Sequence, residues 1–258
     1  MVAPLVAVEL SPGRDLLLVL AGVGAGLFNG VAGGGTLISF PTLLALGYPA
    51  LTANVTSTVG IWPGYLAGVA GFRTEIVDQR RLARRLLPPA IVGAVGGSIL
   101  LLTTPSSDFD KIAPWLVLFA AALFAVQPLL VRVLSGLAHD HPTRQVLMVG
   151  GTFLASLYGG YFGAGLGVML LAVLGLALPN TIARTSGLRT ALSVIVNGVA
   201  AIVFLARATL VWAAVGLLAL GALGGGYVGA RFARRLPAPA LRLIVVAVGL
   251  ATGLRLLL

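Results

Sequence analysis

Hydrophobic residues run along this chain in long stretches without any charged residue, and polar residues gather in the short segments between them. A membrane-spanning helix needs about 20 predominantly apolar residues. The uncharged stretches at 16–51 and 146–181 are too long for one span and short for two. We therefore expect each to form a hairpin of two short arms, either fully spanning or re-entrant. Single spans are predicted at 55–72, 86–102, 112–131, 185–205, 211–229 and 241–258.

Glycines interrupt both long stretches. Gly33, Gly34 and Gly35 stand in a row, with Pro41 shortly after them, and Gly163 and Gly165 break the second stretch. Three glycines lower helix propensity by roughly 1 kcal/mol each. In lipid every backbone polar group must be satisfied internally, so a break at membrane depth is tolerated only where it is buried in protein or lines a cavity. We therefore expect both breaks to line a path for a solute.

The composition indicates a membrane protein. Over 258 residues the chain is 59% hydrophobic and only 9% charged, too little charge for the surface of a soluble domain. It contains no cysteine, which excludes disulfides, thiolate metal sites and cysteine nucleophiles. The net charge of +10 lies in short loops, where it indicates topology rather than a nucleic-acid partner. The first residues lack a basic segment and a cleavage motif, so we expect the first helix itself to target the chain.

The second half of the chain repeats the first in the same order. Gly163 and Gly165 stand 130 residues after Gly33 and Gly35. The segment Ala-Arg-Thr-Ser at 183–186 matches Ala-Asn-Val-Thr-Ser at 53–57 with one residue deleted, and Gly-Ala-Leu-Gly-Gly at 221–225 matches Gly-Ala-Val-Gly-Gly at 93–97. We predict an all-α polytopic membrane protein whose single transmembrane domain, residues 1–258, holds two repeats at about 15–134 and 145–258.

The distribution of arginine predicts how the two repeats are oriented. Short loops rich in arginine and lysine stay in the cytoplasm. Five arginines precede the 86–102 span, whereas in the second half the arginines follow the equivalent span, at 231–242. The repeats are therefore predicted to be inverted, each a glycine-broken helical hairpin followed by three transmembrane helices. Both termini then lie outside the cytoplasm, and the loop with His139 and His141 lies inside.

The predicted spans contain no carboxylate and no histidine, because all seven acidic residues fall in the N-terminal segment or in loops. Cation and metal permeases usually need such groups within the membrane, and intramembrane proteases need an acid–base pair. We therefore expect no enzyme, no metal site and no cofactor. Glycine amides, small hydroxyls and the positive ends of helix dipoles suit an anion instead.

Two arginines near the start of the 185–205 span add to this picture. Because an arginine within a span is costly, it is a functional hypothesis by default. Arg184 is explained equally well as an interfacial side chain that snorkels, whereas for Arg189, five residues deeper, we favour function. Asn197 is explained slightly better by bonding between helices. The predicted substrate-binding residues are Gly33, Gly34, Gly35, Asn54, Thr56, Ser57, Gly163, Gly165, Arg184, Thr185, Ser186, Arg189 and Asn197.

The sequence Gly-Val-Ala-Gly-Gly-Gly-Thr-Leu-Ile-Ser-Phe-Pro-Thr-Leu at 30–43, followed by the segment at 53–57, resembles the opening of the TauE/SafE sulfite exporter family. The segment at 221–236 is similar to the family's second half, and the resemblance runs from about residue 16 to the C-terminus. It implies a bacterial inner-membrane carrier of sulfite or organosulfonates, with the glycine breaks and Thr-Ser pairs at its site. One departure is Leu171, which stands where a second-half partner of Pro41 would be.

We therefore expect a multi-pass secondary transporter of small sulfur-containing anions that works by alternating access. Its expected partners are the anionic solute and the lipid bilayer, and we expect no nucleic-acid partner. The sequence leaves open whether the protein forms a homodimer. Two alternatives remain: a permease for a neutral solute or metal, and a non-transporting membrane scaffold whose glycines serve packing alone.

Overall fold

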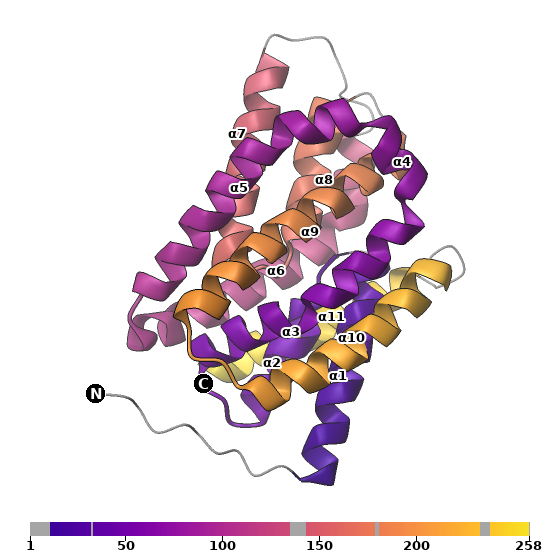
Figure 1. Cartoon of the computed structure of the whole chain (residues 1–258). Coiled ribbons are helices and arrows are strands. Elements are labelled where there is room, and N and C mark those ends of the chain that lie inside the picture. The colour runs from indigo at the N-terminus through magenta and orange to yellow at the C-terminus, as the bar shows by residue number, and fades with distance from the viewer. Residues whose placement is uncertain (1–10, 32, 135–142, 179–180, 233–237, 258) are drawn as a thin grey trace.

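The computed structural model describes residues 11–31, 33–134, 143–178, 181–232 and 238–257, and every regular element within them is an α-helix (Figure 1). This confirms the predicted all-α class. The first half contains α1 (Pro12–Val31), α2 (Thr36–Ala45), α3 (Ala50–Gly71), α4 (Arg73–Asp78), α5 (Arg80–Thr103) and α6 (Ser106–Leu134). The second half contains α7 (Thr143–Tyr161), α8 (Leu166–Ala177), α9 (Ile182–Arg207), α10 (Trp212–Phe232) and α11 (Ala238–Leu257).

Three of the expectations from sequence fall on residues outside these described ranges. They concern the targeting role of the first residues, the orientation of the loop with His139 and His141, and the arginines at 234 and 235.

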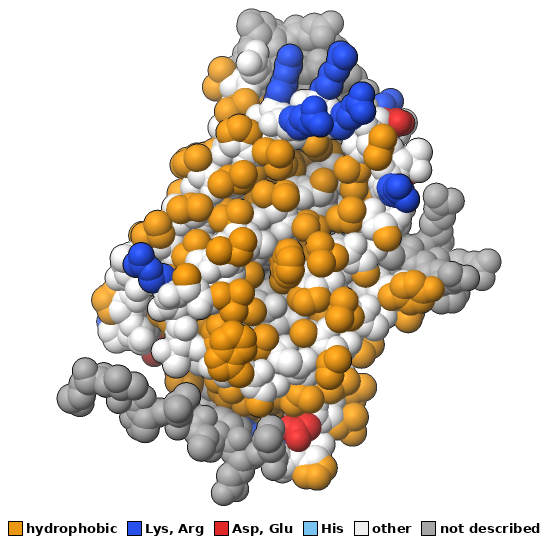
Figure 2. Space-filling model, in the orientation of Figure 1, with side chains coloured by type: hydrophobic (Ala, Val, Ile, Leu, Met, Phe, Trp, Pro, Cys, Tyr) orange, Lys and Arg blue, Asp and Glu red, His pale blue; other side chains and the backbone are white. Residues whose placement is uncertain are grey.

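The surface of the protein is that of a polytopic membrane protein. Within the described ranges, four segments are long and apolar enough to cross a membrane: Arg80–Thr103, Ser106–Leu130, Ala183–Arg207 and Trp212–Gly229. Hydrophobic side chains cover the middle of the face shown in Figure 2, and arginines gather at the end where α4 and the start of α5 lie. A bilayer provides the apolar surroundings that such a surface needs.

The two arms of each hairpin differ in length, which the sequence did not predict. α1 has 20 residues and α2 has 10, while α7 has 19 and α8 has 12. At 1.5 Å per residue, the first arms reach about 30 Å and the second arms about 15–18 Å. The prediction of two short arms is therefore wrong for the first arm. α1 already begins at Pro12, ahead of the uncharged stretch, with Asp15 in its first turn, where an acidic residue favours the helix dipole.

The predicted basic loop before the 86–102 span is helical. α4 occupies its first part, and α5 already begins at Arg80. Arginine is a good helix former, so an arginine-rich segment extends a helix beyond its apolar part. The five arginines Arg73, Arg80, Arg81, Arg84 and Arg85 are all exposed at this end of the protein.

The two halves of the chain pack intimately against each other. The most extensive helix contacts are those of α1 with α10 and of α5 with α7. Both rely on the repeated Gly-Ala-x-Gly-Gly segment: a Cβ on Gly97 would overlap the carbonyl oxygen of Leu157, and a Cβ on Gly225 would overlap that of Val23. The first arm of each hairpin is thus held by a long helix from the opposite half.

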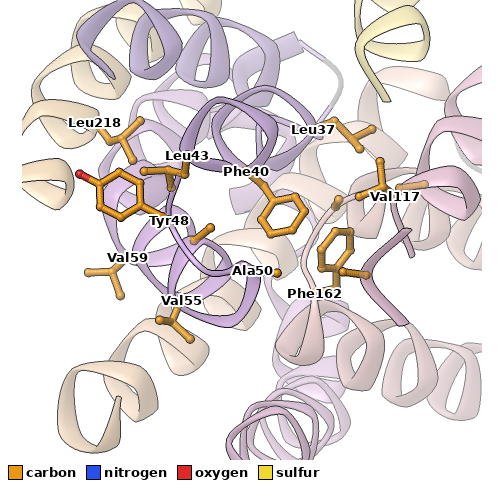
Figure 3. Close-up of a cluster of buried hydrophobic side chains, with 14 of the residues drawn as sticks. Leu37, Phe40, Leu43, Tyr48, Ala50, Val55, Val59, Val117, Phe162 and Leu218 are labelled. Atoms are coloured by element: carbon orange, nitrogen blue, oxygen red, sulfur yellow. The ribbon is translucent and has the colours of Figure 1, made fainter. Parts of the chain in front are cut away.

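α2 lies in the hydrophobic core. Leu37, Phe40 and Leu43 are fully buried, and Figure 3 shows Phe40 next to Phe162, which directly follows α7. The two rings meet edge to face, with centroids 5.3 Å apart and planes at 84°, a favoured aromatic geometry. The second arm of the first hairpin therefore contacts the break in the second hairpin.

Neighbouring glycines of α5 test the close contact between α5 and α7. We expect Gly97→Ala to lower the stability of the purified protein by about 1–3 kcal/mol, because the new methyl group overpacks the helix crossing. A methyl group on Gly96 would only reach ordinary contact, 3.8 Å from Leu157 Cδ1. Gly96→Ala should therefore be neutral or slightly stabilising. Thermal melting in detergent measures both, and equal melting temperatures for the two variants would contradict the contact.

Candidate functional site

The two glycine breaks face each other inside the protein. Gly33 and Gly163 both have left-handed backbone conformations, with φ of +74° and +81°, which glycine adopts readily. A Cβ on Gly33 would lie 3.3 Å from Cα of Gly167, in the first turn of α8. A Cβ on Gly163 would lie 3.6 Å from Oγ1 of Thr36, the first residue of α2. Each break therefore meets the start of the other hairpin's second arm.

The side chain of Asn29 accepts hydrogen bonds from backbone amides of the first break. Its Oδ1 accepts hydrogen bonds from the amides of Gly34, at 3.1 Å, and Gly35, at 2.6 Å. A Cβ on Gly34 would also overlap the ring of Phe124. The expectation that glycine amides are open to a solute is therefore wrong for these two residues, because the protein uses them to satisfy its own backbone.

Arg189 brings a positive charge to the first break. Its side chain is 3% exposed and is the one charged group among the buried residues that the structure describes. Its Nη1 and Cζ lie 3.5 and 3.8 Å from the position that a Cβ of Gly33 would take, and its Nη2 donates to Oγ1 of Thr190 at 3.5 Å. The guanidinium thus lies where the end of α1 meets the first turn of α8.

Tyr65 of α3 is a further member of this site, and sequence reasoning missed it. It is 3% exposed, and its hydroxyl lies near the side chains of Thr36, Asn29 and Arg189. A tyrosine in a span is ordinarily interpreted as an interfacial residue, so its sequence position gave no signal. Asn29 did carry a signal, because it is an amide inside an uncharged stretch directly before the glycines.

Polar side chains continue from Arg189 along one face of α9. Ser193 and Asn197 follow at intervals of four residues, which places all three on the same side of the helix. Ser193 is 3% and Asn197 1% exposed. Asn197 Oδ1 lies 3.4 Å from the position of a Cβ on Gly163. We call Asn29, Thr36, Tyr65, Arg189, Ser193 and Asn197 the central polar cluster. Of the predicted site residues, Gly33, Gly163, Arg189 and Asn197 meet here.

Other predicted residues of the first half join helices. Asn54 donates through Nδ2 to the carbonyl of Tyr161 at 3.0 Å, at the end of α7. Thr56 accepts a hydrogen bond from the amide of Val211 at 3.3 Å. The hydroxyls of Ser57 and Ser39 lie 2.6 Å apart. Asn54 therefore reaches the second break, whereas the other two hydroxyls bond to protein groups elsewhere.

The remaining predicted residues of the second half lie apart from the cluster. The side chain of Arg184 is exposed at the start of α9, where its carbonyl accepts from Gln79 Nε2 at 2.8 Å. Thr185 bonds back to the carbonyl of Thr181 at 3.2 Å, and Ser186 lies in the same turns. A Cβ on Gly165 would face the apolar residues Leu123 and Ala120 of α6. In the described part of the chain, no cluster of histidine, aspartate or glutamate that could hold a metal ion is present.

Asn29 can be tested as the residue that satisfies the first break. We expect Asn29→Ala to lower the free energy of unfolding by about 1–3 kcal/mol, since two buried amides lose their acceptor. Asn29→Asp should keep most of the stability, because a carboxylate oxygen can accept the same two bonds. Melting of the purified variants measures the difference, and equal losses for both would show that the acceptor has no such role.

Comparison with known proteins identifies the family. The family model described as "Sulfite exporter TauE/SafE" matches residues 18–256. A Sinorhizobium protein named "Probable membrane transporter protein ORF9" is 28% identical over 246 residues, which cover 93% of this chain and 91% of that protein. A Haemophilus influenzae protein named "Probable membrane transporter protein" is 30% identical over 181 residues, covering 67% of this chain and 69% of that protein. The chain therefore belongs to the TauE/SafE family of membrane transporters.

Proposed function

We propose that this protein is a secondary transporter that moves a small sulfur-containing anion, such as sulfite or an organosulfonate, across the bacterial inner membrane by alternating access. One observation carries the proposal: the guanidinium of Arg189 is buried where the two helix breaks meet. The family description adds the sulfur oxyanion as the class of solute.

The electrostatics beside Arg189 favour an anion over a neutral solute or a metal cation. The central polar cluster carries a net positive charge, because Arg189 is its one charged member. The first turn of α8 lies beside the guanidinium, and the N-terminal end of a helix attracts negative charge. Gly33 has no side chain there, which lets an oxyanion approach both groups. Tyr65 adds a hydroxyl at the same place.

A scaffold without transport activity explains these features less well. Burying a charged side chain carries a desolvation penalty of several kcal/mol. Hydrophobic packing alone would favour an apolar residue at position 189, as at the buried neighbours Leu188 and Leu192. An arginine kept at such a position, between two interrupted helices, is better explained by a solute that binds it.

We propose that the domain consists of inverted repeats, at about 15–134 and 145–258. The distribution of arginine supports the inversion, and two features of the structure support the repeat itself. The order of long and short helices is the same in the two halves, apart from α4. The contacts are also reciprocal, because α1 packs on α10 as α7 packs on α5. Inverted repeats whose discontinuous helices meet near the midplane are the architecture of many secondary transporters.

Accessibility to a thiol reagent tests the inversion. The chain has no cysteine of its own, and Asp78 and Thr209 are exposed positions that precede the equivalent helices α5 and α10. We expect Asp78→Cys to be protected from an impermeant reagent in intact cells, because arginine-rich loops stay in the cytoplasm. Thr209→Cys and Ser107→Cys should react. If Asp78→Cys and Thr209→Cys react alike, the two repeats are parallel and the proposal of inversion fails.

Substitution of Arg189 tests the anion site. Lysine keeps the charge but loses the planar fork that binds oxyanions through two hydrogen bonds. We expect Arg189→Lys to weaken binding and Arg189→Gln to weaken it about ten- to hundred-fold, since a hydrogen bond to a charged partner is typically worth about 1.5–3 kcal/mol. The measurement is thermal stabilisation of the purified protein by sulfite, thiosulfate, sulfoacetate, taurine and sulfate.

The matched control for this test is Arg81→Gln, which removes an exposed arginine at the end of the protein. It should keep the parent affinity. Parent-like binding by Arg189→Gln would rule out the guanidinium as the anion's partner.

A further inference from the structure

Gly33 and Gly163, one left-handed glycine from each break, lie in surroundings of opposite polarity. The missing side chain of Gly33 would point at the guanidinium of Arg189. Around the position of a Cβ on Gly163, in contrast, the three nearest heavy atoms are all oxygens: Oδ1 of Asn197 at 3.4 Å, the carbonyl of Gly159 at 3.5 Å and Oγ1 of Thr36 at 3.6 Å. Gly159, Thr36 and Asn197 are all buried.

The oxygen of Asn197 is an acceptor without a donor. The Nδ2 of Asn197 donates to the carbonyl oxygen of Ser193 at 2.9 Å. A carbonyl oxygen can only accept, so the amide group cannot be turned around, and Oδ1 must face Gly163. Among the residues that the structure describes, this Oδ1 has no hydrogen-bond partner, although Asn197 is only 1% exposed. A buried unpaired acceptor is costly, which indicates that something with positive charge or a hydrogen-bond donor completes it.

The end of α7 adds further acceptors at the same place. The amides of Phe162 and Gly163 both donate to the carbonyl of Tyr158, at 2.9 and 3.5 Å. The Gly163 amide therefore does not make the regular helical hydrogen bond to the carbonyl of Gly159. Asn54, which bonds to the carbonyl of Tyr161, also has an unpaired and buried Oδ1. The C-terminal end of a helix carries negative partial charge.

The helix of the first half that matches α9 is α3, and it contains no arginine or lysine to balance these oxygens. Counting on from the matched residues Ser57 and Ser186, the position of Arg189 in α9 corresponds to Gly60 in α3. The end of α1 therefore has an arginine beside it, whereas the three atoms nearest to Gly163 are neutral oxygens.

We propose that this oxygen-lined position beside Gly163 is a binding site for a small monovalent cation, sodium. The ligand atoms are those that hard cations prefer, and the carbonyl ends of interrupted helices coordinate sodium in other transporters. A methyl group at this position would meet the three oxygens at ordinary contact distance, so a small ion that has lost most of its water can approach them. Binding of sodium does not depend on the proposed anion transport; its role as the coupling ion does.

A sodium ion here would couple directly to the anion. The two sites lie at opposite glycines of facing breaks, and ions of opposite charge attract each other strongly where water is excluded. Sodium therefore raises the affinity for the anion, and by linkage the anion raises the affinity for sodium by the same factor. This supplies a driving ion in a protein whose described buried residues include no carboxylate that could relay protons.

The experiment measures thermal melting of the purified full-length protein in sodium, potassium or choline chloride at one ionic strength, without any sulfur anion. We expect a saturable rise of about 2–4 °C in sodium alone. Gly163→Ala should remove this rise, because the methyl group fills the site. Gly165→Ala is the matched control: its φ of +83° gives the same backbone strain, but its Cβ faces Leu123 and Ala120. It should keep the sodium-dependent rise.

Asn197→Leu provides a second test that does not depend on how well Gly163→Ala folds. Leucine has a similar volume but no oxygen, so we expect the sodium-dependent rise to disappear. Equal rises in all three salts, or a sodium effect that survives in both variants, would overturn the site. Sodium stabilisation without stabilisation by any of the anions would refute the proposed transport function and leave the cation site intact. Anion binding that depends on Arg189, in a protein that sodium does not stabilise, would support the transport function and overturn the cation site.

Discussion

The fold depends on satisfying the backbone of two helices that are interrupted inside the protein. In hydrocarbon no water is present to bond to the amides and carbonyls that such a break leaves open. The first break meets this demand with one side chain, because Asn29 accepts from the amides of both Gly34 and Gly35. That bond turns the chain so that α2 begins against the second hairpin, and the remaining groups of the central polar cluster assemble around this turn.

The backbone of the second break is not capped in the same way, and the two breaks also differ in the charge beside them. Position 159, which matches Asn29 in the repeat, is a glycine, and no side chain from it caps the break. Position 60, which matches Arg189, is also a glycine. One break thus has a guanidinium beside it and the other has neutral oxygens. Two residue differences between the proposed repeats account for this electrostatic asymmetry.

Much of the fold followed from hydrophobic pattern and glycine placement, because both report directly on membrane depth. The long helices, the two breaks and a functional role for Arg189 could be proposed in this way. The length of α1 and the helix α4 could not, since polar residues at helix ends leave no apolar signal. Tyr65 and Ser193 were missed because their role depends on which helices become neighbours. The pairing of Asn29 with Gly34 and Gly35 likewise depends on the geometry of the turn.

The packing would also limit the proposed alternating access. α1 and α3 pack on α10, while α7 and α9 pack on α5, so each close-packed bundle mixes helices of both halves. A movement of one repeat against the other would have to separate α1 from α10 and α5 from α7, where backbones touch at Gly225 and Gly97. A movement between the two mixed bundles keeps these contacts. It opens instead the interface of α3 with α9, which carries Tyr65, Arg189 and Asn197, and there the bound ions would be exposed to one side and then the other.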